Sequence, residues 1–292
     1  AAGIPMISYA STSPALSDAT AYPHFYRIVP SDALQGQAAA DMIAASGVSN
    51  TAILHMTNSY GAGLGDSVAA HLGAENVCLQ SGYEETATDF AAAVQAVMDT
   101  GCDSVFLGSY SQDGAMIVET MALIGATIPI FSADGMAGEG TWNYFTHPSA
   151  SNGLQVTRPR AAVVSGSTTF TDACAADSVC SYGIFTAEAY DAVMMVGQAA
   201  MMEDGANMDV LINWVGNNYA GESGTHTFLN NGDVDGPGYD VCTFHHVPTY
   251  GQYFNCDRMW KADDGGVRGA PFTGTTVKIG FLNDATGPIA VY

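Results

Sequence analysis

Small polar and aromatic side chains recur directly after the segments of this chain that have the composition of β-strands. Ala10 and Thr12 follow one such segment, Tyr60 and Tyr110 follow two others, and Asp134 follows a fourth. In an open parallel sheet, ligands bind beyond the carboxyl ends of the strands, where these side chains would gather. Hydroxyl groups, aromatic rings and a carboxylate predict a pocket for a small polar ligand that carries positive charge or hydrogen-bond donors.

Each of these residues also has a purely structural interpretation. Tyr60 and Tyr110 could be ordinary strand-end aromatics, Thr12 could belong to a turn before Pro14, and Asp134 could be a helix cap. The repetition of one pattern after several strands favours a binding site over four separate explanations.

The elements that would position these residues alternate along the chain. We expect strands at 3–8, 51–56, 76–80, 104–107 and 129–132, and helices at 34–45, 61–73, 89–98 and 113–124. This alternation predicts an α/β fold with a parallel sheet and helices on both faces. Two more helices are expected at 187–202 and 208–219, followed by strands at 225–229 and 239–246.

The charge balance excludes some classes of partner. The 292 residues include 29 Asp and Glu against 7 Lys and Arg, which gives a net charge of −22. Nucleic acid binding needs clusters of basic residues, and the sequence has none, so no nucleic-acid partner is expected. No apolar run reaches the ~18 residues of a membrane span. The length fits one large domain or two lobes.

Six cysteines indicate an oxidising compartment. Cys174 and Cys180 bracket a short loop, and Cys242 and Cys256 bracket a turn-rich segment, so we expect both pairs to form disulfides. Cys78 and Cys102 begin two successive strand-like segments, and their pairing stays open. Zinc is the alternative near the adjacent histidines 245 and 246, but no CxxC is present, and neighbours on a strand point to opposite faces. We therefore expect no metal and no cofactor.

Enzyme signatures are weak. The run Gly-Ala-Gly-Leu-Gly that begins at Gly61 follows a strand, but Asp66 stands where a dinucleotide-binding fingerprint needs its third glycine. Ser109 lies in Gly-Ser-Tyr and lacks the G-x-S-x-G context of a hydrolase nucleophile. The sequence therefore predicts a binding protein with no catalytic residues.

Several segments resemble a known family, the type I periplasmic binding proteins of branched-chain amino acid ABC transporters. They are, in order, GIPMISYASTSPALSD, YPHFYRIVPSDALQGQAAAD, TAILHMTNSYGAGLGDSV, FLGSYSQDGAMIV, IPIFSADGM, FTAEAYDAVMM and YDVCTFHHV. The resemblance covers nearly the whole chain. The terminal VKIGFLNDATGPIAVY resembles the first strand and loop of the same family, so the first strand comes last here.

This resemblance implies a two-lobed fold that closes on its ligand like a clamshell. We expect residues 1–29 and 161–235 to form a partial first lobe, because the stretch that the family has before GIPMIS is absent. The second lobe should comprise 30–160 and 236–262, followed by a linker at 263–275. Residues 276–292 would then be the first strand and loop of a lobe, in a tandem or a circularly permuted chain.

The resemblance also implies a function and roles for the residues at the strand ends. It implies extracytoplasmic binding of an amino acid of the branched-chain type, in the periplasm or outside the cell, with or without a membrane anchor, and delivery to an ABC transporter permease. The alternative is a sensor domain of a receptor or regulator with the same fold. Ala10 and Thr12 match the loop that holds the ligand's α-carboxylate, and Asp134 matches the acid that pairs with its α-ammonium. Tyr60 and Tyr110 match aromatics of the second lobe, and Tyr292 matches an aromatic at the pocket mouth.

Overall fold

A computed structural model describes residues 3–160, 168–182, 184–202, 207–236, 238–269, 279–283 and 287–291. Its helices are α1 (Asp32–Ala45), α2 (Ser59–Leu72), α3 (Ala91–Asp99), α4 (Ser111–Leu123), α5 (Thr169–Ala175), α6 (Ser178–Tyr182), α7 (Thr186–Ala200) and α8 (Met208–Val215). Its strands are β1 (Met6–Ser8), β2 (Phe25–Arg27), β3 (Thr51–Met56), β4 (Val77–Tyr83), β5 (Ser104–Gly108), β6 (Ile130–Ser132), β7 (Gln155–Pro159), β8 (Tyr219–Ala220), β9 (Thr225–His226), β10 (Tyr239–Val247), β11 (Gly251–Lys261), β12 (Gly266–Gly269), β13 (Ile279–Asn283) and β14 (Gly287–Val291).

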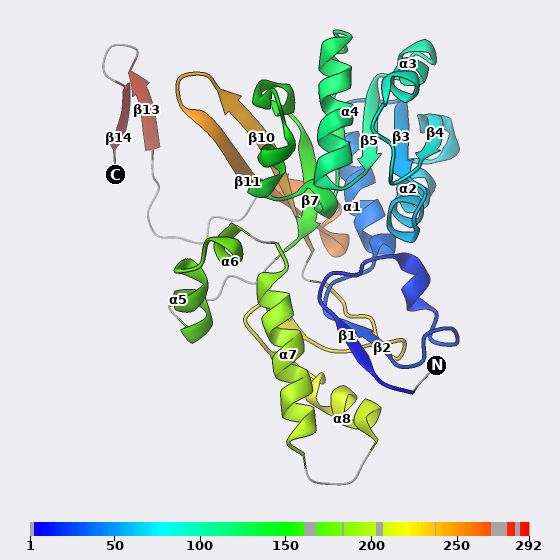
Figure 1. Cartoon of the computed structure of the whole chain (residues 1–292), viewed down its shortest axis with the longest axis vertical. Helices are drawn as coiled ribbons and strands as arrows, with labels where there is room; N and C mark the ends of the chain where they lie inside the picture. Colours follow the sequence, from blue (N-terminus) through cyan, green and yellow to red (C-terminus); the bar gives the residue numbers. More distant parts are fainter. Residues whose placement is uncertain are drawn as a thin grey trace.

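Most of these strands form one sheet with the order β12-β11-β10-β7-β6-β5-β3-β4 (Figure 1). The strands β4, β3, β5, β6 and β7 are parallel, as the sequence predicts. The sheet continues through antiparallel β10, β11 and β12. A parallel sheet with an antiparallel edge is common in α/β folds.

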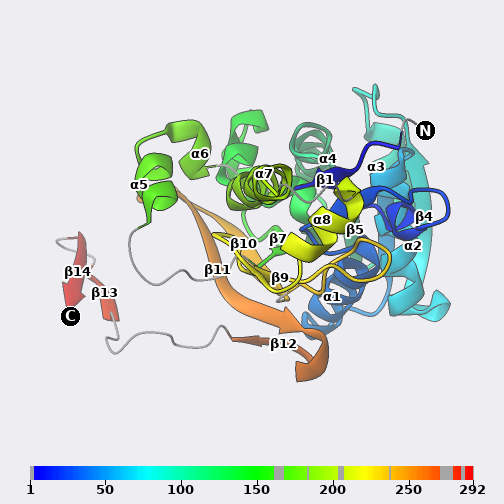
Figure 2. The same ribbon diagram turned by 90° about the horizontal axis from the view of Figure 1, so that it is seen from below.

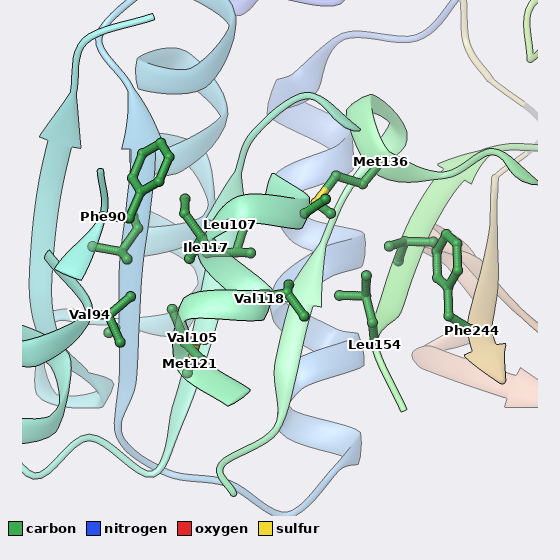
Figure 3. Close-up of a cluster of buried hydrophobic side chains, with 14 of the residues drawn as sticks. Phe90, Val94, Val105, Leu107, Ile117, Val118, Met121, Met136, Leu154 and Phe244 are labelled. Atoms are coloured by element: carbon green, nitrogen blue, oxygen red, sulfur yellow. The ribbon is translucent and has the colours of Figure 1, made fainter. Parts of the chain in front are cut away.

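The strands of this sheet are apolar on both faces. Along β5, Val105 and Leu107 lie in one hydrophobic cluster, and Phe106 between them lies in another. Successive side chains of a strand point to opposite faces, so the two clusters cover the two sides. Figure 3 shows the first cluster, to which α4 contributes Ile117 and Val118. Helices α1 and α2 contribute to the second cluster.

A smaller region is built from segments far apart in the sequence. Strands β1 and β2 form a parallel pair, and α7 and α8 pack with them around a separate cluster that includes Tyr26, Met195 and Ile212. Figure 1 shows α7 and α8 near β1 and below the helices of the large sheet, and Figure 2 shows the same elements from below. After β2 the chain leaves the smaller region and enters the large-sheet region at Pro30. Helix α1 follows, with Ser31 as its N-cap and Asp32 as its first residue.

Some sequence expectations are wrong in detail. Residues 266–269 fall in the expected linker 263–275 but form β12, which pairs with β11. The turn-rich segment between Cys242 and Cys256 is the tip of a β-hairpin, because the aromatic and β-branched residues around the turn favour pairing. The expected helix 208–219 ends at Val215, where Gly216 follows. The terminal strand β13 pairs with β14 in a two-stranded sheet separate from β1 and β2, an arrangement that the sequence left open.

Candidate functional site

Asp134 lies where parallel strands deliver ligand contacts. It begins a short 3-10 helix (Asp134–Met136) directly after β6, and its side chain is buried. The Tyr60 hydroxyl donates a hydrogen bond to Asp134 Oδ1 at 3.0 Å and accepts one from the Gly135 N–H at 3.0 Å. A Cβ atom on Gly135 would lie 2.4 Å from the Ser109 carbonyl oxygen and 2.7 Å from the Tyr60 hydroxyl. Only glycine therefore permits this approach.

Tyr110 completes an aromatic wall beside this carboxylate. Tyr60 is the second residue of α2 and Tyr110 is the N-cap residue of α4, and each follows a neighbouring strand of the sheet. Their rings are stacked, with centroids 5.0 Å apart and planes inclined by 6°. Tyr60 is buried, whereas Tyr110 is 47% exposed. The exposed ring therefore offers a face to a ligand, and the buried ring fixes its position.

Thr12 connects the loop after β1 to a second buried carboxylate. Its hydroxyl donates to Asp32 Oδ2 at 2.8 Å, and its carbonyl oxygen accepts the Asp32 N–H at 2.8 Å. Both residues are buried. The Thr12 hydroxyl proton is therefore used on Asp32, and the N–H groups of Ala10 and Ser11 point to the Ser8 hydroxyl oxygen, so this loop offers the predicted carboxylate contact fewer donors than the sequence suggests.

The loop that carries Ala10 and Thr12 is fixed by a buried arginine. Arg27 is completely buried and donates from Nε to Asp233 Oδ1 at 2.6 Å. Its guanidinium also donates to the Ser11 and Ser13 carbonyl oxygens and to the Ser17 hydroxyl. Ala10, half-buried, places its N–H 3.4 Å from the Ser8 hydroxyl, which accepts a weak hydrogen bond. The predicted ligand loop is thus held from inside the protein.

Burial raises the pKa of both buried carboxyl groups, and the charge of Asp134 adds to the rise at Asp32. Burial raises the pKa of Asp134 to about 6, and the nearby side chains Tyr60 and Gln35 partly oppose this rise. Burial also raises the pKa of Asp32 well above its usual range, and the charge of Asp134 adds to that rise. Two carboxyl groups in one dry site cannot both ionise cheaply unless a cation joins them.

Hydrogen-bond acceptors without donors lie in the same place. Asp32 Oδ1 and Gln35 Oε1 are buried, and neither has a hydrogen-bond partner among the described residues. Both side chains are fully buried, and both belong to α1. A buried acceptor without a donor is destabilising, so these atoms suit a ligand that brings donors.

The structure thus brings together Tyr60, Tyr110 and Asp134, and it places Thr12 on Asp32. Tyr292 lies outside the described residues, so its predicted role at the pocket mouth is not placed. Asp32 and Gln35 were missed in the sequence, because Ser31 and Asp32 look like an ordinary helix start. The signal for them was an acid two residues after Pro30, at the passage between the two regions.

The cysteines form three disulfides. The two predicted pairs, Cys174–Cys180 and Cys242–Cys256, are bridged in the structure. The third bridge joins Cys78 and Cys102, the two residues whose pairing stayed open from the sequence. Among the described residues, no group of three or more His, Cys, Asp or Glu side chains is placed to hold a metal ion. In the same part of the chain, no helix has the length and apolarity needed to cross a membrane.

Comparison with known proteins places this architecture in a family. Residues 1–246 match the family model described as the receptor family ligand binding region. The chain belongs to this family. Its structure superposes on a leucine binding protein, LivK, of Thermotoga maritima with a TM-score of 0.73 and 21% identity, over 90% of this chain and 74% of that one. The fold is therefore the type I periplasmic binding fold.

Other similar proteins are of two kinds, a transporter substrate-binding protein and metabotropic glutamate receptors. LivJ of Streptococcus pneumoniae, solved in complex with isoleucine, superposes with a TM-score of 0.69 and 18% identity, over 82% of this chain and 69% of that one. Metabotropic glutamate receptor 6 of Oryctolagus cuniculus is 36% identical over 102 residues, which are 33% of this chain and 12% of the receptor. Metabotropic glutamate receptor 8 of Homo sapiens is 48% identical over 58 residues, 20% of this chain and 6% of the receptor. The similar segment therefore spans only a small part of these receptors.

Proposed function

We propose that this chain belongs to an extracytoplasmic binding protein that takes an amino acid of the branched-chain type and delivers it to an ABC transporter. The observation that carries the proposal is the buried pair Asp32 and Asp134 with an acceptor, Asp32 Oδ1, that has no donor among the described residues. An α-ammonium group brings three donors and one positive charge, which match both needs. The stacked Tyr60 and Tyr110 supply an adjoining aromatic wall.

The remaining roles follow from the same geometry. Asp134 and Asp32 pair with the ammonium, Tyr60 orients Asp134, and the exposed face of Tyr110 contacts the ligand. The backbone around Ala10 and Thr12 receives the α-carboxylate. Lobe closure would remove water from the site, and the lower polarity then strengthens each of these interactions. The solved structures of LivK and LivJ, named for leucine binding and solved with isoleucine, support an amino acid ligand and a non-enzymatic role.

A periplasmic or extracellular location accompanies this proposal. Three disulfides in one chain favour an oxidising compartment. The permease of an ABC transporter would be the macromolecular partner, and a membrane anchor on the protein is compatible with that role.

The second candidate is a ligand-sensing domain of a receptor. It is favoured by the sequence matches to metabotropic glutamate receptors, which reach 36% and 48% identity over their aligned segments. Both candidates use the same amino acid site, so ligand binding does not separate them. Cross-linking of the ligand-bound protein in its native membrane separates the two candidates. A transport protein should cross-link to a permease, whereas a sensor should cross-link to a signalling domain.

Removal of one site charge tests the proposal. Asp134→Asn keeps the size of the side chain and removes its charge, so an ammonium group loses a buried partner. We expect leucine affinity to fall about 30-fold or more, which corresponds to a loss of roughly 2–5 kcal/mol. Isothermal titration calorimetry with leucine, and with its deaminated analogue 4-methylpentanoate, measures the effect.

The matched control is Asp99→Asn, an exposed aspartate at the end of α3. It removes the same charge far from the site and should leave leucine affinity within about twofold, the range usual for a surface substitution. Equal affinities in Asp134→Asn and the parent, or binding of 4-methylpentanoate as tight as that of leucine, would contradict recognition through the ammonium group.

A further inference from the structure

Tyr110 borders a second hollow in addition to the Asp134 site. This cavity has a volume of about 360 Å³, and its lining includes Tyr110, Glu85, Asp113, Met56 and Met116. These residues come from the carboxyl ends of β3 and β5 and from the segments that follow β4 and β5. The cavity therefore lies at the same edge of the sheet as the proposed amino acid site, and Tyr110, which lines it, stacks on the Tyr60 ring that donates to Asp134.

The two carboxylates of this cavity accept hydrogen bonds from uncharged donors. Asp113 Oδ1 accepts the Tyr110 N–H at 3.1 Å, and Asp113 Oδ2 accepts the Tyr83 hydroxyl. Glu85 Oε1 accepts the Asn58 side-chain amide at 2.5 Å. Hydrogen bonds of this kind orient a carboxylate but leave its negative charge in place. The cavity therefore presents two negative charges.

The positively charged side chains of the described residues are engaged elsewhere. Their contacts are Arg27 with Asp233, Arg158 and Arg160 with Asp240, Arg258 with Gln155, and Arg268 with the Asp264 carbonyl oxygen, while Lys261 lines a separate hollow near Asp235. Within the described part of the chain, no Lys or Arg lines the cavity at Tyr110. An anionic group that entered it would meet carboxylates without a compensating cation.

Two further observations connect this cavity to the amino acid site. Burial, and after it the charges of Asp134, Glu85, Asp32 and Asp113, raise the pKa of Tyr110. All four carboxylates therefore act on the same ring. The buried Asp32 Oδ1 has no donor among the described residues, so the amino acid site also offers an acceptor that a ligand donor can fill.

We propose that the site rejects amino acids with an anionic side chain, and that Glu85 and Asp113 are the specificity-determining residues. The inference rests on the proposed function and narrows it. A ligand held by its ammonium on Asp134 directs its side chain past Tyr110 toward the second cavity. An aliphatic side chain meets Met56 and Met116 there, whereas a γ-carboxylate meets Glu85 and Asp113. The site therefore differs in ligand class from what the names of the glutamate receptor relatives suggest.

Paired ligands of equal shape test this inference. Glutamine and glutamate differ at the side-chain terminus mainly in charge, and so do asparagine and aspartate. We expect the parent protein to bind each amide at least about tenfold more tightly than the matching acid, because like charges in a partly buried site repel. Calorimetric titration at low ionic strength gives the ratio, and the ratio should shrink as salt is added.

Variants assign the effect to the named carboxylates. Glu85→Gln should reduce the glutamine-to-glutamate ratio about threefold or more. Asp113→Asn should have the same effect on this ratio. If Asp113→Asn disturbs the start of α4, Glu85→Gln still tests the inference. The matched control is Glu84→Gln, an exposed neighbour that does not line the cavity and should leave the ratio unchanged.

The outcomes separate the two proposals. If leucine binds but glutamate binds as tightly as glutamine, or the ratio is the same in Glu85→Gln and the parent, the specificity inference is wrong and the proposed function stands. If no amino acid binds and 4-methylpentanoate and leucine behave alike, the proposed function is wrong, and this inference is wrong with it.

Discussion

The large sheet and the region of β1, β2, α7 and α8 bury their apolar side chains in different ways. The large sheet has a hydrophobic cluster on each face, and the smaller region has one cluster. Strand β5 of the large sheet pairs with a strand on each side and buries apolar residues on both faces. In the smaller region, β1 and β2 form a two-stranded sheet that packs with α7 and α8 around one cluster. Large hydrophobic side chains stay exposed on these helices, among them Val193 and Trp214.

The comparison teaches where rigidity and adaptability lie relative to the site. Asp134, Tyr60 and Tyr110 are placed by strand ends of the large sheet, so their geometry is fixed by two packed faces. Thr12 comes from the smaller region, and it reaches the large-sheet region through its hydrogen bonds with Asp32. The Thr12–Asp32 contact therefore joins two regions that pack around separate hydrophobic clusters.

Core truncations should show the largest difference between the two regions. Leu107→Ala removes a fully buried side chain at the centre of the large sheet and should lower the free energy of unfolding by about 3–5 kcal/mol. Met195→Ala removes a fully buried side chain of α7, where the surroundings can collapse around the gap, and should cost about 2 kcal/mol. Urea unfolding of both variants gives these values.

Leu123→Ala is the control, because Leu123 is 81% exposed at the end of α4 and its truncation should cost under about 0.5 kcal/mol. A larger loss for Met195→Ala than for Leu107→Ala would reverse the assignment of the rigid half.

Protonation of Asp134 should change the free energy of unfolding of the ligand-free protein by somewhat less than the Leu107→Ala substitution does. Its pKa in the folded protein is about 6, above the ordinary value of 3.8, so the folded state binds this proton more tightly than the unfolded state. The stabilisation is fully present below about pH 3.8 and is lost as pH rises through about 6. Two pKa units correspond to on the order of 3 kcal/mol.

Unfolding of the parent and of Asp134→Asn, compared between pH 4 and pH 7, measures this contribution together with the effect of Asp134 on Asp32. The parent should lose more stability over this interval than the variant. If the free energy of unfolding changes with pH equally in the two proteins, Asp134 ionises without a burial penalty. The proposal that this site binds a cationic group would then lose its support.

The positions of the strand-end residues could be predicted from the sequence, and the completeness of the site could not. Tyr60, Tyr110 and Asp134 follow strands that alternate with helices, and parallel topology alone brings such residues to one edge. Asp32 belongs to a helix start, and its importance comes from burial against Asp134, which depends on tertiary packing. The proposed role of Glu85 could not be predicted either, because it depends on the cavity that Glu85 and Asp113 line together.

The fold shows the same division. Alternating apolar runs predict the parallel strands and their helices, because each element has its own periodicity. Pro248, Tyr250 and Gly251 indicate a long loop in the sequence, but the tip of the β10–β11 hairpin comprises only 248–250, and Gly251 begins β11. The short strand β2 has too few residues for a periodic signal and is specified by its pairing with β1.

Removal of the two disulfides outside the β10–β11 hairpin should produce the smallest difference in stability. Cys78–Cys102 closes a loop with a sequence separation of 24 next to the first hydrophobic cluster, and Cys174–Cys180 closes one of only 6. Under the chain-entropy relation, removal of these bridges by paired Ser substitutions should cost about 3.5 and about 2 kcal/mol. Thermal unfolding of the two double variants measures the difference. A greater loss for the shorter loop would show that native-state strain outweighs loop entropy here.

The buried arginine of the smaller region has a consequence for ionic strength. A surface with a net charge of −22 repels itself, and added salt weakens this repulsion, so the stability of the whole molecule should depend on salt. Arg27 and Asp233 are shielded from water, with 0% and 11% of their side chains exposed, and mobile ions screen such a pair far less. The loop of Ala10 and Thr12 is anchored by that pair. Its position should therefore stay constant from dilute buffer to concentrated brine, while the surface around it responds.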